Sequence, residues 1–305
     1  MQVKPFLLMP IVLGLLGVPS AIAAPLAEIS LDNNPIRNQT ITSDGVRVVV
    51  TAYDPKNDTN FEQTNLSYEI YINDELKVQE QTDAWWHGSL SLQNLDADTI
   101  PEVVVSTYTG GAHCCTILTL YSWQGDRLHR NQTYPLDGFA GQFEDLDGDG
   151  NSEFVTVDNR FLYAFSSYAG SYPPLIILSL QDGFWVDATR TFPEMQRSHA
   201  YGMYERTRTG HSIEINGTLA GYVAQKILMD EYQSGWDYMQ VHYNQEDSWG
   251  LTVTNLDGEV VHNYPDFPAA LSAFLIDTGY LTNTGEPNTD LDLSDFIFEQ
   301  ASFQE

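Results

Sequence analysis

A short acidic stretch near the middle of the chain restricts the local fold more than any other feature. Residues 142–155 read QFEDLDGDGNSEFV, with aspartates at alternate positions and glycines between them. Glycine adopts backbone conformations that other residues avoid, so this chain can turn tightly enough for alternate carboxylates to converge on one point. Apolar residues flank the acidic centre on both sides, as they do in strands. The stretch therefore predicts a calcium loop between two β-strands.

Residues 145–153, the downstream loop, offer oxygen donors of the kind and number that calcium requires. Carboxylates stand at loop positions 1, 3, 5 and 9, and a backbone carbonyl is available at position 7. These residues are, in order, Asp145, Asp147, Asp149, Glu153 and, for the carbonyl, Asn151. So flexible and anionic a set favours Ca²⁺ over Mg²⁺, and the alternative is a solvated acidic turn. An EF-hand is excluded because it needs a glutamate at position 12, where Thr156 stands.

An internal repeat predicts a second copy of this loop upstream. Residues 90–105 align without gaps on residues 141–156, and each copy continues into further predicted strands. Each unit would have about four short strands in about 50 residues, which is the size of one propeller blade. Two related blade-like units are therefore expected between residues 85 and 195.

The paired loops and strands resemble the FG-GAP (VCBS-type) repeat of integrin-like β-propellers, over about residues 86–190. The resemblance implies that the loop residues of both copies hold calcium and brace a blade. In residues 94–102, the upstream loop, it implies the ligands Asn94, Asp96, Asp98, Ile100 (through its carbonyl) and Glu102. Asn94 replaces an acid and Ala97 replaces a glycine of the pattern, so weaker calcium binding is expected there.

The start of the chain has the pattern of a secretory signal. An apolar run over residues 6–18 precedes Ala21 and Ala23, which fit a cleavage site, so residues 1–23 are predicted to be a signal peptide. The alternative is an uncleaved membrane anchor. No later stretch is apolar enough to span a bilayer, so the mature chain is expected to have no transmembrane segment and to be secreted or periplasmic.

The charge balance limits the partners of this protein. The chain has 13 lysines and arginines against 42 aspartates and glutamates. This negative field argues against nucleic acid and anionic membranes as partners, and it is compatible with bound divalent cations.

Periodicity predicts a mainly β fold with a C-terminal helical part: a small or partial β-propeller packed on a helical subdomain. Strands are expected over residues 46–53, 66–72 and 76–80 as an antiparallel meander, after an irregular segment, and again over 161–165. Helices are expected over 216–232, with Gly235 as the stop, and over 267–277, capped by Asp266. The predicted divisions are the signal peptide 1–23, a β meander 24–84, two repeats 85–195, an α+β part 196–282 and a loose acidic tail 283–305.

The chain has two cysteines, Cys114 and Cys115, which are adjacent and follow His113. Several interpretations are open: a vicinal disulfide, a metal site with His113, a cysteine nucleophile with His113 as base, or cysteines with a structural role only. Neighbouring residues of a strand point to opposite faces, which weakens the metal interpretation. A structural role, with a possible disulfide, is the favoured interpretation.

These observations predict a calcium-binding module with a binding or structural role and no evident catalysis, which meets a protein or glycan partner outside the cytoplasm. One alternative is a secreted carbohydrate-binding protein or hydrolase that uses the aromatic residues Trp85, Trp86 and His87. Another is a redox-linked module that uses Cys114 and Cys115.

Overall fold

The computed structural model describes residues 21–22, 24–56, 62–111, 114–125, 127–209 and 214–302. The predicted signal peptide lies outside the described residues except for Ala21 and Ile22, which form strand β1 (Ala21–Ile22). In the described part of the chain, no helix has the length and apolar character that crossing a bilayer requires.

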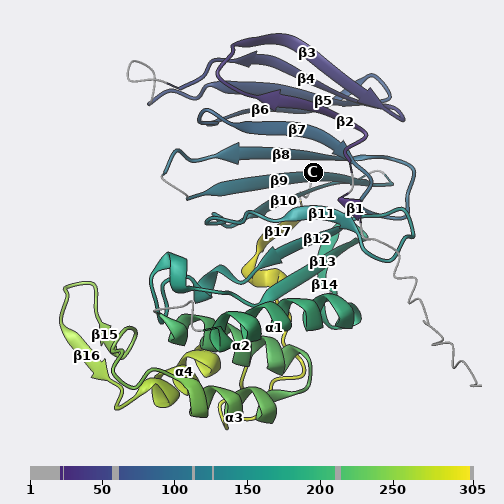
Figure 1. Cartoon of the computed structure of the whole chain (residues 1–305). Coiled ribbons are helices and arrows are strands. Elements are labelled where there is room, and N and C mark those ends of the chain that lie inside the picture. Colours follow the sequence, from purple (N-terminus) through teal and green to yellow (C-terminus); the bar gives the residue numbers. More distant parts are fainter. Residues whose placement is uncertain are drawn as a thin grey trace, which may run out of the picture.

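Three antiparallel sheets follow one another from the purple end of the chain toward the green helices in Figure 1. The N-terminal sheet has the order β3 (Ile36–Ser43), β4 (Val46–Tyr53), β5 (Leu66–Ile72), β6 (Glu75–Thr82). The central sheet has the order β17 (Phe298–Ser302), β10 (Arg127–Thr133), β9 (Thr116–Gln124), β8 (Glu102–Tyr108), β7 (Gly88–Gln93), β2 (Ala27–Leu31). The third sheet has the order β1, β11 (Gln142–Asp145), β12 (Glu153–Val157), β13 (Leu175–Gln181), β14 (Phe184–Asp187). Sheet order shows no closed ring among these described strands, and the fold is mainly β with helices toward the C-terminus.

The predicted meander over residues 46–82 is confirmed as β4, β5 and β6. β5 alternates buried and half-buried residues along its length, as a strand with one face on a core does. The expectation that the segment before this meander is irregular is wrong, because β3 lies there and pairs with β4 from end to end. β3 is polar and mostly exposed, so only its pairing with β4, and no apolar alternation, identifies it as a strand.

The two predicted repeat units are four-stranded meanders, β7 to β10 and β11 to β14. The strand expected over residues 161–165 is wrong. That segment instead follows a 3-10 turn, η1 (Asn159–Phe161), which Asp158 caps by accepting a hydrogen bond from the Arg160 backbone N–H. Phe161 and Phe165 of this segment are buried beside α4, whereas Tyr163 between them is exposed.

Four helices cover the far end of the third sheet: α1 (Pro193–Arg208), α2 (Ile215–Leu228), α3 (Tyr232–His242) and α4 (Phe267–Asp277). The predicted Asp266 cap of α4 is confirmed, since Asp266 accepts a hydrogen bond from the Ala269 N–H at 2.9 Å. The Gly235 stop is wrong, because α2 ends at Leu228 and Gly235 lies inside α3 against Lys226. A side chain at Gly235 would collide with Lys226, so packing explains this glycine.

The acidic tail is not loose over its described part. β17 pairs with β10 and completes the edge of the central sheet. Leu293, Ile297 and Phe298 are buried, and the Phe298 ring stacks on Trp185 with 4.8 Å between ring centroids. The sequence also allowed residues 296–298 to dock, and Ile297 and Phe298 do so while Phe296 stays exposed, because the apolar anchors outweigh the polar composition of the tail.

A small hairpin, β15 (Thr252–Thr254) with β16 (Val260–Asn263), extends from the helical part in Figure 1. Residues 255–259 form its turn, in which Asn255 accepts a hydrogen bond from the Glu259 N–H at 2.9 Å.

Candidate metal centre

Both acidic loops occupy the same place in their units. The upstream loop joins β7 to β8, and the downstream loop joins β11 to β12. In each, the glutamate at position 9 begins the second strand of the pair, as Glu102 opposite Gln93 and Glu153 opposite Glu144. The repeat seen in the sequence is therefore a repeat in strand register.

One hydrogen bond recurs in both loops and holds the position 9 glutamate in place. Glu102 Oε2 accepts from the Leu95 N–H at 2.9 Å, and Glu153 Oε2 accepts from the Leu146 N–H at 2.9 Å. Because each bond closes position 9 onto position 2, each loop is held in the same curled form.

The downstream loop brings together the carboxylates of Asp145, Asp147 and Asp149, which offer oxygens that all lie within 4.8 Å of one another. Asp145 accepts hydrogen bonds from the N–H groups of Gly148 at 2.7 Å and Gly150 at 3.1 Å. Both glycines have positive φ, of 79° and 96°, which is why glycine is required at these turns.

The other two predicted residues of the downstream loop support the gathered group. Glu153 lies outside that group of three carboxylates and bonds the Leu146 amide. Asn151 donates from its backbone N–H to Asp149 Oδ1 at 2.7 Å and from its side chain to Asp149 Oδ2 at 3.1 Å.

The upstream loop brings together Asp96, Asp98 and Glu102, again with oxygens within 4.8 Å of one another. Ile100 donates its N–H to Asp98 Oδ1 at 2.6 Å, in the same register as Asn151 and Asp149 in the other loop. Asn94 differs from these three residues because its side-chain nitrogen donates a hydrogen bond to the downstream loop.

Glu102 is the residue here that most strongly indicates a ligand. It is 1 % exposed, and its Oε1 has no hydrogen-bond partner in the described part of the chain. A buried polar atom without a partner is costly and uncommon in folded proteins. A cation held by Asp96, Asp98 and Glu102 would satisfy this oxygen, so the donor set fits calcium.

The electrostatics of the upstream loop also favour a cation. Burial, and to a smaller extent the neighbouring charge of Asp96, raises the pKa of the Glu102 carboxyl to about 8. Burial also raises the pKa of Asp96 and of Glu153. Carboxylates brought together in a buried place disfavour their own charged forms, and a divalent cation reverses that preference.

Weaker calcium binding was expected in the upstream loop because it has fewer acidic residues and fewer glycines than the downstream loop. The structure adds burial, which the sequence did not reveal. Asp96 and Glu102 are buried, whereas Asp147 and Asp149 are exposed. The upstream group is therefore the more enclosed of the two, although it lacks the position 1 carboxylate.

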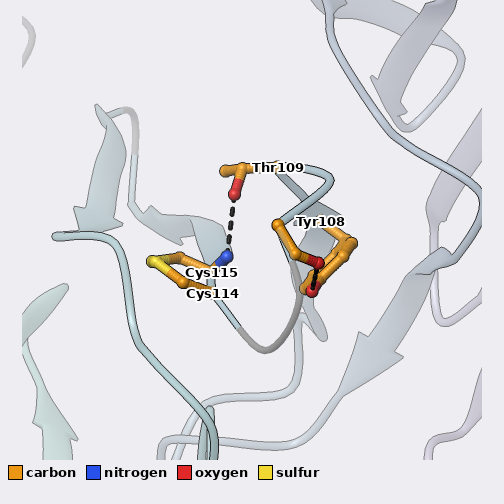
Figure 2. The surroundings of a disulfide bond; sticks show 5 residues. Tyr108, Thr109, Cys114 and Cys115 are labelled. Carbon is orange, nitrogen blue, oxygen red and sulfur yellow. Dashed lines mark hydrogen bonds between the residues drawn. A yellow bond between two sulfur atoms is a disulfide. The ribbon is translucent and has the colours of Figure 1, made fainter.

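The two cysteines are joined in a disulfide directly before β9 (Figure 2). Cys115 donates its N–H to Thr109 Oγ1 at 2.7 Å, and its carbonyl accepts from the Thr109 N–H at 2.9 Å. Tyr108 donates its hydroxyl hydrogen to the Gly111 carbonyl. His113 lies outside the described residues, so its predicted roles as a ligand or base stay predictions.

We expect Cys114 and Cys115 of the purified protein to resist alkylation until a reductant is added. Iodoacetamide applied to unfolded, unreduced protein should add no label, and the same treatment after reduction should add two. Intact-mass spectrometry measures both, with the reduced sample as the control. Two labels on unreduced protein would contradict the disulfide.

The aromatic residues proposed as a sugar-stacking platform are largely occupied by the protein itself. Gly110 covers the Trp85 ring so closely that a Cβ there would lie 2.4 Å from it. His87 stacks on Tyr108 with 4.1 Å between ring centroids. Trp86 keeps 43 % of its surface exposed. Trp85 lines a cleft of about 360 Å³ between the N-terminal and central sheets.

A family model described as the sll0997 C-terminal domain matches residues 196–279, which contain most of α1, the helices α2 to α4 and the hairpin. The chain is 39% identical over 206 residues to "Probable thylakoid lumen protein sll0997" of Synechocystis sp., covering 63% of this chain and 60% of that protein. It is 30% identical over 222 residues to "Uncharacterized protein y4bJ" of Sinorhizobium fredii, covering 70% of this chain and 35% of that protein. The chain thus spans less than two thirds of the length of either relative. No solved structure matches it.

Proposed function

We propose that this protein is a calcium-stabilised β-repeat protein that acts as a binding or structural module outside the cytoplasm. The carrying observation is the pair of loops in one register, each with three carboxylates whose oxygens lie within 4.8 Å of one another. Glu102 adds a buried oxygen without a partner in the described chain. Calcium at these loops joins the first two strands of each unit and stabilises the sheet to which they belong.

We also propose that the chain is a partial β-propeller whose second and third blades are FG-GAP-type repeats. Three four-stranded meanders, β3 to β6, β7 to β10 and β11 to β14, support this assignment. The second and third begin with a strand, an acidic loop and another strand, which is the order of the FG-GAP repeat. The N-terminal sheet is then a divergent blade without a calcium loop.

The proposed location rests on the predicted signal peptide and on one relative, whose printed name places it in the thylakoid lumen. The lumen is separated from the cytosol by a membrane, as are the periplasm and the exterior. Extracellular modules use weaker calcium sites than cytosolic sensors do, and the exposed carboxylates of Asp147 and Asp149 in the downstream loop suit such a site. The partner of the module is an unidentified protein or glycan.

Calcium counting tests the proposal. We expect two bound ions per chain, measured by equilibrium dialysis followed by elemental mass spectrometry. The double variant Asp96→Asn/Glu102→Gln should lose the upstream ion, and Asp145→Asn/Asp149→Asn should lose the downstream ion, because each removes two of three gathered carboxylates.

The matched control is Asp257→Asn/Glu259→Gln, which removes two acidic groups from the exposed hairpin turn. It should still bind two ions. A wild-type chain that binds no calcium at millimolar concentration would show the proposal to be wrong.

A further inference from the structure

The two loops touch one another directly, although they are far apart in the sequence. Asn94 Nδ2 donates to the Gly150 carbonyl at 2.7 Å and lies 3.3 Å from Asn151 Oδ1. The Ser152 N–H donates to the Asn94 carbonyl at 3.0 Å. The first residue of the upstream loop is thus held by the last part of the downstream loop.

This contact connects the two carboxylate groups through short steps. On the upstream side, Leu95 follows Asn94 directly, and its N–H bonds the buried Glu102 carboxylate at 2.9 Å. On the downstream side, Asn151 bonds both carboxylate oxygens of Asp149. A movement of either group therefore moves atoms that bond the other loop.

We infer that the two loops bind calcium as one coupled unit, with Asn94 as the residue that links them. The inference rests on the calcium binding proposed above. An ion in one loop orders the backbone around Asn94, so the second loop loses less conformational freedom when its own ion binds. By linkage, each ion raises the affinity of the other loop by the same factor.

The link explains why an asparagine stands where the repeat pattern has an aspartate. An amide has both a donor nitrogen and an acceptor oxygen, whereas a carboxylate only accepts. Aspartate at position 94 would place a negative charge against the Gly150 carbonyl and Asn151 Oδ1 and would lose both contacts. Asparagine at this position can offer its Oδ1 oxygen to the upstream ion, while its Nδ2 nitrogen donates to the downstream loop.

Calorimetric titration with Ca²⁺ of the wild type and of the two double variants tests the inference. Each double variant keeps one loop intact. We expect the remaining loop to bind calcium at least about five-fold more weakly than in the wild type, by the same factor in both directions. Circular dichroism verifies that each variant is folded.

Asn94→Asp tests the role of the link itself. In this background, disabling one loop should leave the affinity of the other unchanged, although the added carboxylate brings the upstream loop closer to the repeat pattern. The control Asn255→Asp adds the same charge to the hairpin turn and should keep the wild-type coupling. If Asn94→Asp does not fold, the two double variants still test whether the loops are coupled.

The outcomes separate the two proposals. A wild type that binds two ions, with each loop unaffected by loss of the other, overturns the coupling and leaves the calcium proposal intact. A wild type that binds no calcium overturns both. Coupling that persists unchanged in Asn94→Asp overturns the assignment of Asn94 as the link.

Discussion

Removing calcium with EDTA is expected to lower the melting temperature of this protein by roughly 10 °C. A ligand that binds only the folded state stabilises it by about 2.7 kcal/mol when its free concentration is 100-fold above Kd. Two such sites contribute about 5 kcal/mol, and each kcal/mol shifts the melting temperature of a chain of this size by about 2 °C or more.

Differential scanning calorimetry with millimolar EDTA, and again after calcium is restored, measures this effect. Magnesium at the same concentration should restore much less, because it prefers a smaller and more rigid site. A variant that lacks both carboxylate groups is the control and should melt at the same temperature with and without EDTA. A wild type indifferent to EDTA would contradict calcium bracing.

Replacing Asp158 with alanine is expected to have the largest effect of any single substitution discussed for this chain. Asp158 is 1 % exposed and lies at the end of β12. It accepts hydrogen bonds from Arg160 Nε at 2.9 Å and Nη2 at 2.6 Å, and from the Tyr280 hydroxyl at 3.0 Å. These contacts tie the third sheet to the segment that follows α4.

Asp158→Ala leaves the Arg160 guanidinium without its carboxylate and the Tyr280 hydroxyl without its acceptor. Breaking a buried ion pair from one side costs about 3–5 kcal/mol of unfolding free energy. Because a quarter of the Arg160 side chain is exposed, we expect a loss of about 3 kcal/mol, at the lower end of that range. Urea denaturation monitored by tryptophan fluorescence measures the change.

The matched control is Glu194→Ala, which breaks the exposed ion pair between Glu194 and Arg197. Ion pairs in solvent contribute little, so this variant should unfold at nearly the wild-type urea concentration. An Asp158→Ala variant as stable as Glu194→Ala would show that the buried network does not hold the two parts together.

Local patterns in the sequence were sufficient for several elements of the fold. β5 was predictable because buried and polar residues alternate along it, and α4 because Asp266 stands at its start as a capping residue. Gly148 and Gly150 predicted the tight turns of the downstream loop, because glycine adopts positive φ readily. In each case the deciding interactions lie within a few residues of one another.

Other elements depended on partners that are remote in the sequence. β3 is a strand because it pairs with β4, and β17 is a strand because it pairs with β10. α1 and α3 were not predicted at all, and both pack against α2, which is buried on nearly every side. Tertiary packing decided the structure of these segments, because local propensity is a weak guide where such contacts are made.

The acidic loops show the same division. The sequence by itself determined the spacing of carboxylates and glycines, a local property of each loop, and this spacing predicted which residues would gather. Only the tertiary structure decided that Glu102 is buried, with an oxygen that has no partner among the described residues, and that Asn94 bonds Gly150. The physical reason is that burial and contact between the loops depend on how the central and third sheets pack, which no single stretch of the chain specifies.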